Sequence, residues 1–257
     1  MNLPMPMLQF HYYIKRLLVD AFSSPETTPE AIASYILSAQ KRPVDKREVE
    51  PISKIITERK IQHLVHFTHI ENIPKILKYG LIPRKYLDLE AIRIAVNPRV
   101  SDPRRLDNRR QENCLSITHP NYEMFYKKRV LSKNHDTWGV ILIDASVMTE
   151  FFFEFTKGNS ASSDMTPVPG SKGLSNLFID ETRQNDQYLN PNETIDPQAE
   201  ALEDSILPPS RVRDVKVQSE KAAQYLAKKG VQATVDFGYF KERNYSKKNS
   251  KMASYGY

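Results

Sequence analysis

The sequence predicts an α+β fold in which a helical N-terminal region precedes a mixed β-sheet. Segments with helical periodicity dominate the first sixty residues, whereas short apolar or alternating runs typical of strands begin at His63. At 257 residues the chain can bury a substantial core, and it shows no internal repeat. We divide it into a helical extension (1–60), a main domain (61–240) and a basic tail (241–257) that we expect to be flexible.

Three segments before residue 61 are predicted to be helical. The run 12–22 is rich in apolar residues. Thr27 and Glu30 have the spacing of a capping box, which satisfies backbone donors at the start of a helix, ahead of the apolar run 31–37. The segment 51–60 places three isoleucines on one stripe, as expected for an amphipathic helix.

The main domain opens with a predicted strand and helix. The run 63–67 is typical of a strand, and apolar spacing at 72–79 indicates the helix, with Gly80 placed to cap its C-terminus. The polar stretch 84–111 is long for a structureless connection inside a compact domain, so we expect a functional loop there.

The second half alternates further strands and helices. We expect a helix from His119 with Pro120 in its first turn, and another at 220–229. A strand at 198–202 would place Gln198 and Glu200 on one face, where an amide and a carboxylate can grip adjacent hydroxyls of a ribose. The other predicted strands are 113–118, 138–144, 151–155, 212–217 and 231–237.

Charge and cysteine content indicate the kind of partner and the cellular compartment of the protein. Lys and Arg number 37 against 31 Asp and Glu, and the resulting net charge of +6 fits a polyanionic partner. Cys114 is the only cysteine, so no intramolecular disulfide can form, which suits a reducing compartment. No apolar stretch approaches the length of a membrane span. We therefore expect a soluble cytoplasmic protein without a membrane partner.

Several kinds of site are excluded by their missing motifs. The sequence has neither a glycine-rich phosphate loop nor a nucleophile elbow. His63, His66 and His69 are spaced by three, but a strand followed by a turn would not bring them together, so we predict no metal site. His66 and Thr68 lie two apart and would present a ring nitrogen and a hydroxyl on one face.

Four segments, taken together, resemble the DarT family of bacterial toxins, which ADP-ribosylate bases of single-stranded DNA. They are Ile61–Leu81, then Arg105-Leu106-Asp107 with Cys114–Arg129, then Asn159–Ser163, and finally Asp196–Glu200. The resemblance implies an ADP-ribosyltransferase fold, in which NAD lies in a cleft of a split mixed sheet. NAD would be the co-substrate.

The resemblance also implies roles for individual residues. Glu200 matches the catalytic glutamate, and Arg105 matches the arginine linked to NAD and catalysis, with Arg104 close enough to be the functional one instead. His66 and Thr68 would hold the nicotinamide ribose and carboxamide. We further predict that Asn72 contributes to NAD binding, that Tyr122, Gln198 and Asn121 contribute to acceptor binding, and that the loop 188–197 meets the acceptor.

The leading hypothesis is an NAD-dependent transferase that modifies a nucleobase in single-stranded nucleic acid. DNA is favoured, RNA is the close alternative, and guanine or thymine is the expected base. Such an enzyme would be the toxin of a toxin–antitoxin or phage-defence system, restrained by an antitoxin protein. An NAD-using RNA 2′-phosphotransferase, served by the arginines at 99–110, and a non-catalytic nucleic-acid-binding module remain alternatives.

Overall fold

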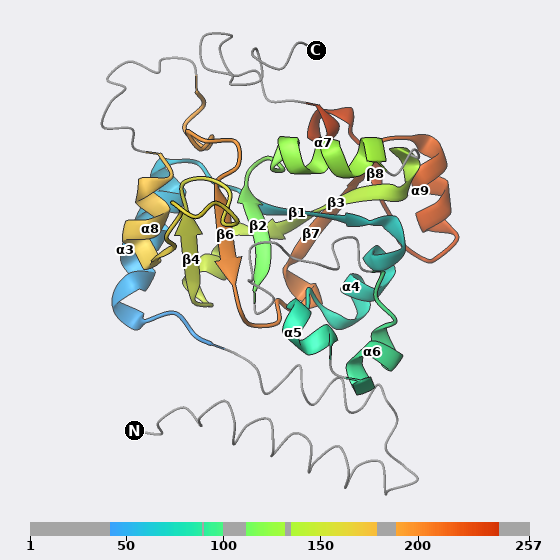
Figure 1. The fold of residues 1–257 in the computed structure, drawn as a ribbon, viewed down its shortest axis with the longest axis horizontal. Coiled ribbons are helices and arrows are strands. Elements are labelled where there is room, and N and C mark those ends of the chain that lie inside the picture. Colours follow the sequence, from blue (N-terminus) through green and yellow to red (C-terminus); the bar gives the residue numbers. More distant parts are fainter. Residues whose placement is uncertain (1–41, 89, 100–111, 132–134, 179–188, 242–257) are drawn as a thin grey trace, which may run out of the picture.

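The computed structural model describes residues 42–88, 90–99, 112–131, 135–178 and 189–241 (Figure 1). The strands are β1 (His63–His69), β2 (Asn113–Ile117), β3 (Trp138–Asp144), β4 (Phe153–Thr156), β5 (Val168–Pro169), β6 (Glu200–Glu203), β7 (Val212–Val217) and β8 (Thr234–Val235). The α-helices are α3 (Lys46–Glu58), α4 (Ile73–Tyr79), α5 (Arg84–Leu87), α6 (Glu90–Val96), α7 (Tyr122–Leu131), α8 (Gly170–Asn176) and α9 (Glu220–Ala227). Short 3₁₀ helices are η1 (Ile70–Asn72), η2 (His135–Thr137), η3 (Ala145–Thr149), η4 (Pro209–Arg211) and η5 (Phe237–Phe240).

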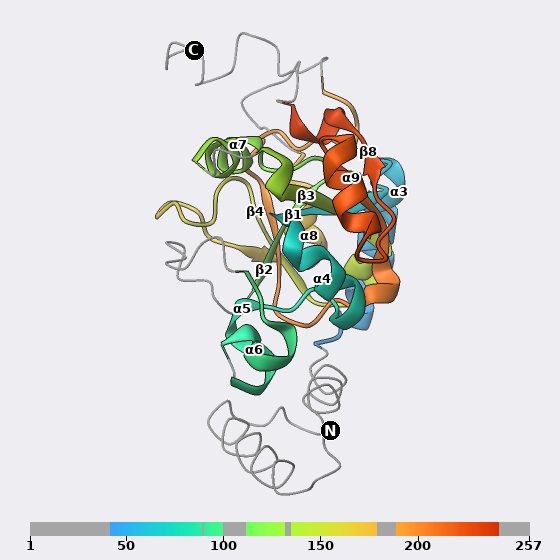
Figure 2. The same cartoon turned by 90° about the vertical axis from the view of Figure 1, so that its right-hand side faces the viewer.

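These strands form one sheet in the order β5-β4-β6-β2-β1-β3-β7-β8. Neighbouring strands are antiparallel except β7 and β8, which are parallel. Helices cover both faces, and Figure 2 shows α7 on the opposite side of the sheet from α9 and α3. The predicted α+β architecture with a mixed sheet is therefore confirmed.

Each face of the sheet buries its own apolar core. On β3, Ile141 and Ile143 belong to the larger core, whereas Val140 and Leu142 belong to the smaller one. Successive side chains of a strand point to opposite faces, so a strand buried on both sides needs a continuous apolar run. The larger core receives side chains from α3, α4, α8 and α9, and the smaller one receives Phe125 from α7 and Phe240 from η5.

The helix α3 begins earlier than the sequence predicted. Asp45 caps its N-terminus, since the Asp45 carboxylate accepts a hydrogen bond from the Arg47 backbone N–H at 2.9 Å. Ile52 is buried in the larger core, so this part of the predicted extension packs on the domain. The boundary at residue 60 stays a prediction, and the predicted helices at 12–22 and 31–37 lie outside the described residues.

The polar stretch 84–111 is not a continuous loop, because its described part contains α5 and α6. The predicted strand at 151–155 starts only at Phe153, since Phe151 forms an isolated bridge with Pro43 instead. The predicted strand at 231–237 is reduced to the two residues of β8. It ends because the Asp236 side chain accepts from the Gly238 N–H at 2.9 Å and starts η5.

The tract that carries Glu200 is also shorter as a strand than predicted. Gln198 lies in a turn, and β6 begins at Glu200. The Asp196 carboxylate accepts from the Gln198 N–H at 2.7 Å, and its carbonyl accepts from the Ala199 N–H at 3.1 Å. Aspartate commonly closes such turns through its side chain. The predicted pairing of Gln198 and Glu200 on one strand face is therefore wrong.

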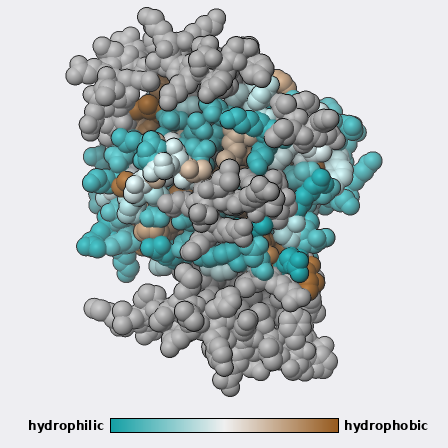
Figure 3. Space-filling view, in the orientation of Figure 1, coloured by the Kyte–Doolittle hydropathy of each residue, from teal (hydrophilic) through white to brown (hydrophobic). Residues whose placement is uncertain are grey.

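The surface seen in Figure 3 is largely hydrophilic over the described residues, with scattered apolar side chains. None of the helices in the described ranges is long and apolar enough to span a bilayer.

A short backbone bridge joins the segment after α4 to the segment after β6. Leu81 and Leu207 exchange two backbone hydrogen bonds, at 2.9 and 3.1 Å, and form an isolated antiparallel bridge. Gly80 permits this approach, since it has a φ of +92° and an added Cβ would lie 2.5 Å from the Leu207 carbonyl oxygen. A side chain at residue 80 would therefore suffer both backbone strain and a clash.

Gly80→Ala should lower the free energy of unfolding by about 3 kcal/mol, since it adds a clash to the cost of a left-handed residue. Gly230→Ala is the matched control: Gly230 has a φ of +75°, but nothing lies within 4 Å of an added Cβ. That control should lose only about 1 kcal/mol. Urea unfolding of the three proteins measures the difference, and equal losses would contradict the clash.

Candidate active site

The site lies where the sheet splits between β1 and β2. All seven residues of β1 pair with β3, from His63 with Asp144 to His69 with Trp138. The same strand pairs with β2 only at Leu64 and Val65. The other part of β2, Asn113 to Leu115, pairs with β6 on the far side. The two halves of the sheet therefore diverge, and a cavity of about 340 Å³ opens between them.

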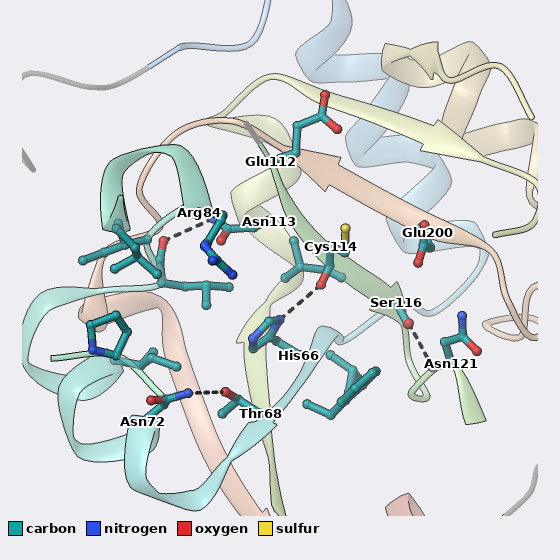
Figure 4. A pocket seen from close by; sticks show the side chains of 18 of the residues that line it. His66, Thr68, Asn72, Arg84, Glu112, Asn113, Cys114, Ser116, Asn121 and Glu200 are labelled. Carbon is teal, nitrogen blue, oxygen red and sulfur yellow. Dashed lines mark hydrogen bonds between the residues drawn. The ribbon is translucent and has the colours of Figure 1, made fainter. Parts of the chain in front are cut away.

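Of the nine residues that the sequence assigned to the site, five line this cavity. They are His66, Thr68, Asn72, Asn121 and Glu200 (Figure 4). Tyr122 and Gln198 are not among its lining residues. Arg104 and Arg105 lie outside the described residues.

His66 spans the split. Its ring Nδ1 lies 3.1 Å from the Cys114 carbonyl oxygen on β2, as Figure 4 shows. An Nδ1–H donated to this carbonyl leaves Nε2 as the nitrogen that can accept a hydrogen bond. The bond also fixes the plane of the ring at the middle of the cavity. His63 and His69 belong to the opposite face of β1, because side chains alternate along a strand.

Thr68 and Asn72 form the wall of the cavity next to α4. The Asn72 side-chain amide donates to the Thr68 hydroxyl at 3.1 Å and to the Arg99 carbonyl at 2.8 Å. Its carbonyl accepts from the Arg99 backbone N–H at 2.8 Å. Asn72 therefore ties the segment after α6 to the start of α4, a structural use that the sequence did not predict.

Glu200 is the first residue of β6, and only 4 % of its surface is exposed. The Ser160 backbone N–H donates to its Oε2 at 3.0 Å. Burying a carboxylate is costly unless hydrogen bonds compensate, so this contact both satisfies and orients the group. Gln198 does not line the cavity itself but contacts a residue that does. Its Oε1 accepts a hydrogen bond from the Asn159 side-chain amide at 3.4 Å, and Asn159 lines the cavity.

Asn121 and Tyr122 mark the start of α7, which begins at Tyr122 rather than at His119 as the sequence predicted. Asn121 is buried against the cavity, whereas Tyr122 pairs with Tyr126 at 5.6 Å between ring centroids. Tyr126 is 43 % exposed. The tyrosine pair therefore belongs to the surface of α7, outside the cavity lining.

Several cationic side chains of the cavity were not predicted as site residues. They are Lys75, Arg84, Arg99 and Lys128. Arg84 is paired with Asp88 at 3.1 Å, and Arg99 is paired with Glu71 at 3.0 Å. Burial lowers the pKa of Lys75 below its usual value. Arg99 belongs to the arginine cluster at 99–110 that the sequence linked to the phosphotransferase alternative. Lys75, Arg84 and Lys128 could not be selected from the sequence, because lysine and arginine occur throughout the chain and only the fold brings these residues together.

No group of three or more His, Cys, Asp or Glu side chains in the described ranges is placed to hold a metal ion. The side chains that line the cavity offer hydrogen bonds and positive charge to a ligand. A cleft with a buried carboxylate, a histidine and several cations fits a ligand that carries both hydroxyls and phosphates.

Residues 65–237 match the family model described as ssDNA thymidine ADP-ribosyltransferase, DarT. The chain belongs to the DarT family. This confirms the resemblance found in the sequence. Comparison with curated proteins gives no significant match.

Solved structures of DarT proteins share this fold. Thermosipho africanus DarTG in complex with ADP-ribose is 20 % identical with a TM-score of 0.52, over 70 % of this chain and 51 % of that one. The chain thus spans about half the length of the Thermosipho chain. Thermus sp. 2.9 DarT in complex with NAD⁺ is 16 % identical with a TM-score of 0.51, over 71 % of this chain and 98 % of that one. The same Thermus protein in complex with ADP-ribosylated ssDNA is 13 % identical with a TM-score of 0.51, over 71 % and 97 % of the two chains.

A second buried acid, Glu203, lies three residues beyond Glu200 on β6. Burial raises its pKa to about 8, although its carboxyl accepts from the Ser205 N–H at 2.5 Å and from the Asn113 amide at 3.4 Å. Asn113 lines the cavity and also donates to the Leu81 and Ser205 carbonyls, at 3.2 and 3.3 Å. Glu203 is therefore neutral near pH 7, and it contacts Asn113 although its own side chain is not part of the cavity lining.

Glu203 should make folding stability depend on pH. Its pKa is raised in the folded state, so its contribution is fully present below about pH 4.5 and is lost as the pH rises to about 8. Urea unfolding at pH 5 and pH 8 should show a larger loss for the wild type than for Glu203→Gln, by more than about 1 kcal/mol. Parallel losses in the two proteins would show that Glu203 is ionised in the folded state.

Proposed function

We propose that this chain transfers ADP-ribose from NAD to a base of single-stranded DNA and releases nicotinamide, with Glu200 as the catalytic carboxylate. The observation that carries the proposal is a buried, oriented carboxylate in the split of the sheet, in the same cavity as His66 and Thr68. Membership of the DarT family supports the same chemistry. RNA as acceptor and the 2′-phosphotransferase alternative gain no support from either observation.

Glu200 suits the reaction because breaking the nicotinamide–ribose bond builds positive charge on the sugar. A carboxylate near the ribose stabilises this charge where it develops. The Ser160 N–H already holds the carboxylate in place, so little reorganisation is needed during the reaction. Glu200 can also accept the proton of the attacking base, a general-base role worth about a hundredfold or more.

NAD would lie along the cavity from the Glu200 end towards α4. In this proposal His66 and Thr68 hold the nicotinamide ribose and carboxamide, and Asn72 supports Thr68 through its 3.1 Å hydrogen bond. Arg105 or Arg104 would bind NAD as in the family. The cavity cations Lys75, Arg84 and Arg99 favour an anionic group such as the pyrophosphate, because charge-assisted hydrogen bonds to phosphate are strong.

The acceptor strand would approach from the side of α7. Asn121 lines the cavity, and the tyrosine pair at the start of α7 offers aromatic surface for an unpaired base, each such stack being worth roughly 1–3 kcal/mol. Gln198 would act through Asn159, which it contacts. Tyr122 and Gln198 are thus proposed as neighbours of the acceptor rather than as parts of the cavity wall.

We also propose that the protein is a cytoplasmic toxin restrained by an antitoxin protein. The likeness to a structure described as DarTG and the family assignment support a toxin–antitoxin role. A single cysteine is consistent with a reducing compartment.

Glu200→Gln should abolish transfer, lowering the rate at least about a thousandfold, because an amide neither stabilises positive charge nor accepts the proton. The assay incubates the protein with NAD and oligonucleotides of each base, as DNA and as RNA, and identifies ADP-ribose adducts by mass. Glu203→Gln is the matched control, since it makes the same change three residues along β6 at a side chain that does not line the cavity. Activity unchanged in Glu200→Gln would overturn the assignment.

Arg105→Ala should strongly reduce turnover in the same assay, because it removes the side chain that is proposed to bind NAD through charge-assisted hydrogen bonds. The expected loss is at least about tenfold in kcat/KM for NAD. Arg104→Ala is the neighbouring control. A larger loss in Arg104→Ala would show that the functional arginine is displaced by one residue.

A further inference from the structure

One polar group of the cavity is left without a partner in the described part of the chain. It is the side-chain amide nitrogen of Asn121, whose residue is only 2 % exposed. The other buried groups of this kind belong to residues that do not line the cavity: His69 Nε2, Thr118 Oγ1, Arg129 Nε and Asp204 Oδ1. Asn121 therefore combines burial, an unsatisfied donor and a place in the cavity wall.

The orientation of the Asn121 amide follows from its other contacts. Its Oδ1 accepts from the Met124 N–H at 3.2 Å and so caps the start of α7. Its backbone N–H donates to the Ser116 hydroxyl at 3.1 Å. Because the oxygen is committed to the helix, Nδ2 must point the other way, and Figure 4 shows it on the side of Asn121 that faces Glu200.

A buried N–H without an acceptor is costly, so one in a cavity wall suits a ligand that can accept its hydrogen bond. Within one cavity, the Asn121 amide offers a donor and the Glu200 carboxylate offers an acceptor. The complementary ligand edge has a carbonyl oxygen next to an N–H. Thymine has this edge at its ring N–H, which lies between two carbonyls, and guanine has it at its ring N–H beside one carbonyl.

We propose that Asn121 donates to a carbonyl oxygen of the acceptor base and thereby restricts the acceptor to bases with a carbonyl beside a ring N–H. This inference rests on the proposed function. Adenine and cytosine present an amino group and a ring nitrogen without hydrogen at the corresponding edge. The amino group would meet the Asn121 donor, and Glu200 would find no ring proton to accept.

The arrangement is consistent with a balanced transfer. The ring N–H proton passes to the Glu200 carboxylate, and the ring nitrogen bonds to the ribose carbon that nicotinamide leaves. The electron pair of the broken bond stays on the nicotinamide nitrogen, which departs as a neutral molecule. Asn121 takes no proton. It holds the base and stabilises the negative charge that develops on the carbonyl oxygen of the base as the ring proton leaves.

The test is a double-mutant cycle between Asn121 and the base. Wild type and Asn121→Ala are compared on single-stranded oligonucleotides whose single acceptor base is thymine, 2-thiothymine or 4-thiothymine. On thymine the variant should lose about 10- to 100-fold in kcat/KM. Sulfur accepts hydrogen bonds weakly, so on the analogue that replaces the contacted oxygen the loss should shrink to about threefold or less.

Asn72→Ala is the control, since Asn72 lines the same cavity but its amide is bonded to Thr68 and Arg99. Its loss should be the same on all three oligonucleotides. Asn121→Asp keeps an oxygen for the Met124 N–H and replaces the donor by an acceptor, so a loss at least as large as in Asn121→Ala, with an unchanged melting temperature, supports the inference.

Two outcomes would overturn the inference while leaving the proposed function intact. One is an equal loss for Asn121→Ala on all three bases. The other is that Asn121→Ala changes only the KM for NAD, which would mean that the Asn121 amide binds NAD and not the acceptor base. Absence of any ADP-ribose adduct with the wild-type protein would instead overturn the proposed function itself.

Discussion

The incomplete pairing of β1 with β2 is the constraint on which the rest of the site depends. If β1 paired along its whole length on both sides, the sheet would be closed at His66 and no cavity could form. Pairing stops after Val65, so the backbone of β2 must find other partners. The Cys114 carbonyl accepts from the His66 ring, which makes a side chain of one half-sheet a substitute for the lost strand contact.

The cavity keeps its shape only if the two halves of the sheet on either side of it are rigid. The pairing of β1 with β3 and of β2 with β6 provides this rigidity, and the bridge between Leu81 and Leu207 rejoins segments that follow α4 and β6. Gly80 is the residue that allows the two backbones to meet.

Sequence patterns predicted strands in each half, because β2 carries apolar alternation and β3 a continuous apolar run. The resemblance to DarT singled out Glu200 and His66, and both line the cavity. The position of Gln198 was not predictable from strand periodicity, since a hydrogen bond to Asp196 closes a turn at that point. Asn121 was predicted as an acceptor-binding residue, but its unsatisfied amide could not be predicted, because it depends on a helix cap and on burial that only the fold creates.

Two buried acids on one short strand have different environments. Glu203 has no charged partner strong enough to offset its burial, so its pKa rises and it stays neutral near pH 7. Glu200 faces the cavity and receives the Ser160 N–H from the loop at 158–164. That loop is fixed by its own contacts, since the Asn159 side chain accepts from the Ala161 N–H at 2.9 Å and the Thr156 hydroxyl donates to the Gly158 carbonyl at 2.8 Å. The carboxylate is therefore held by a backbone group that cannot easily move away, which is the condition for stabilising charge on a bound sugar.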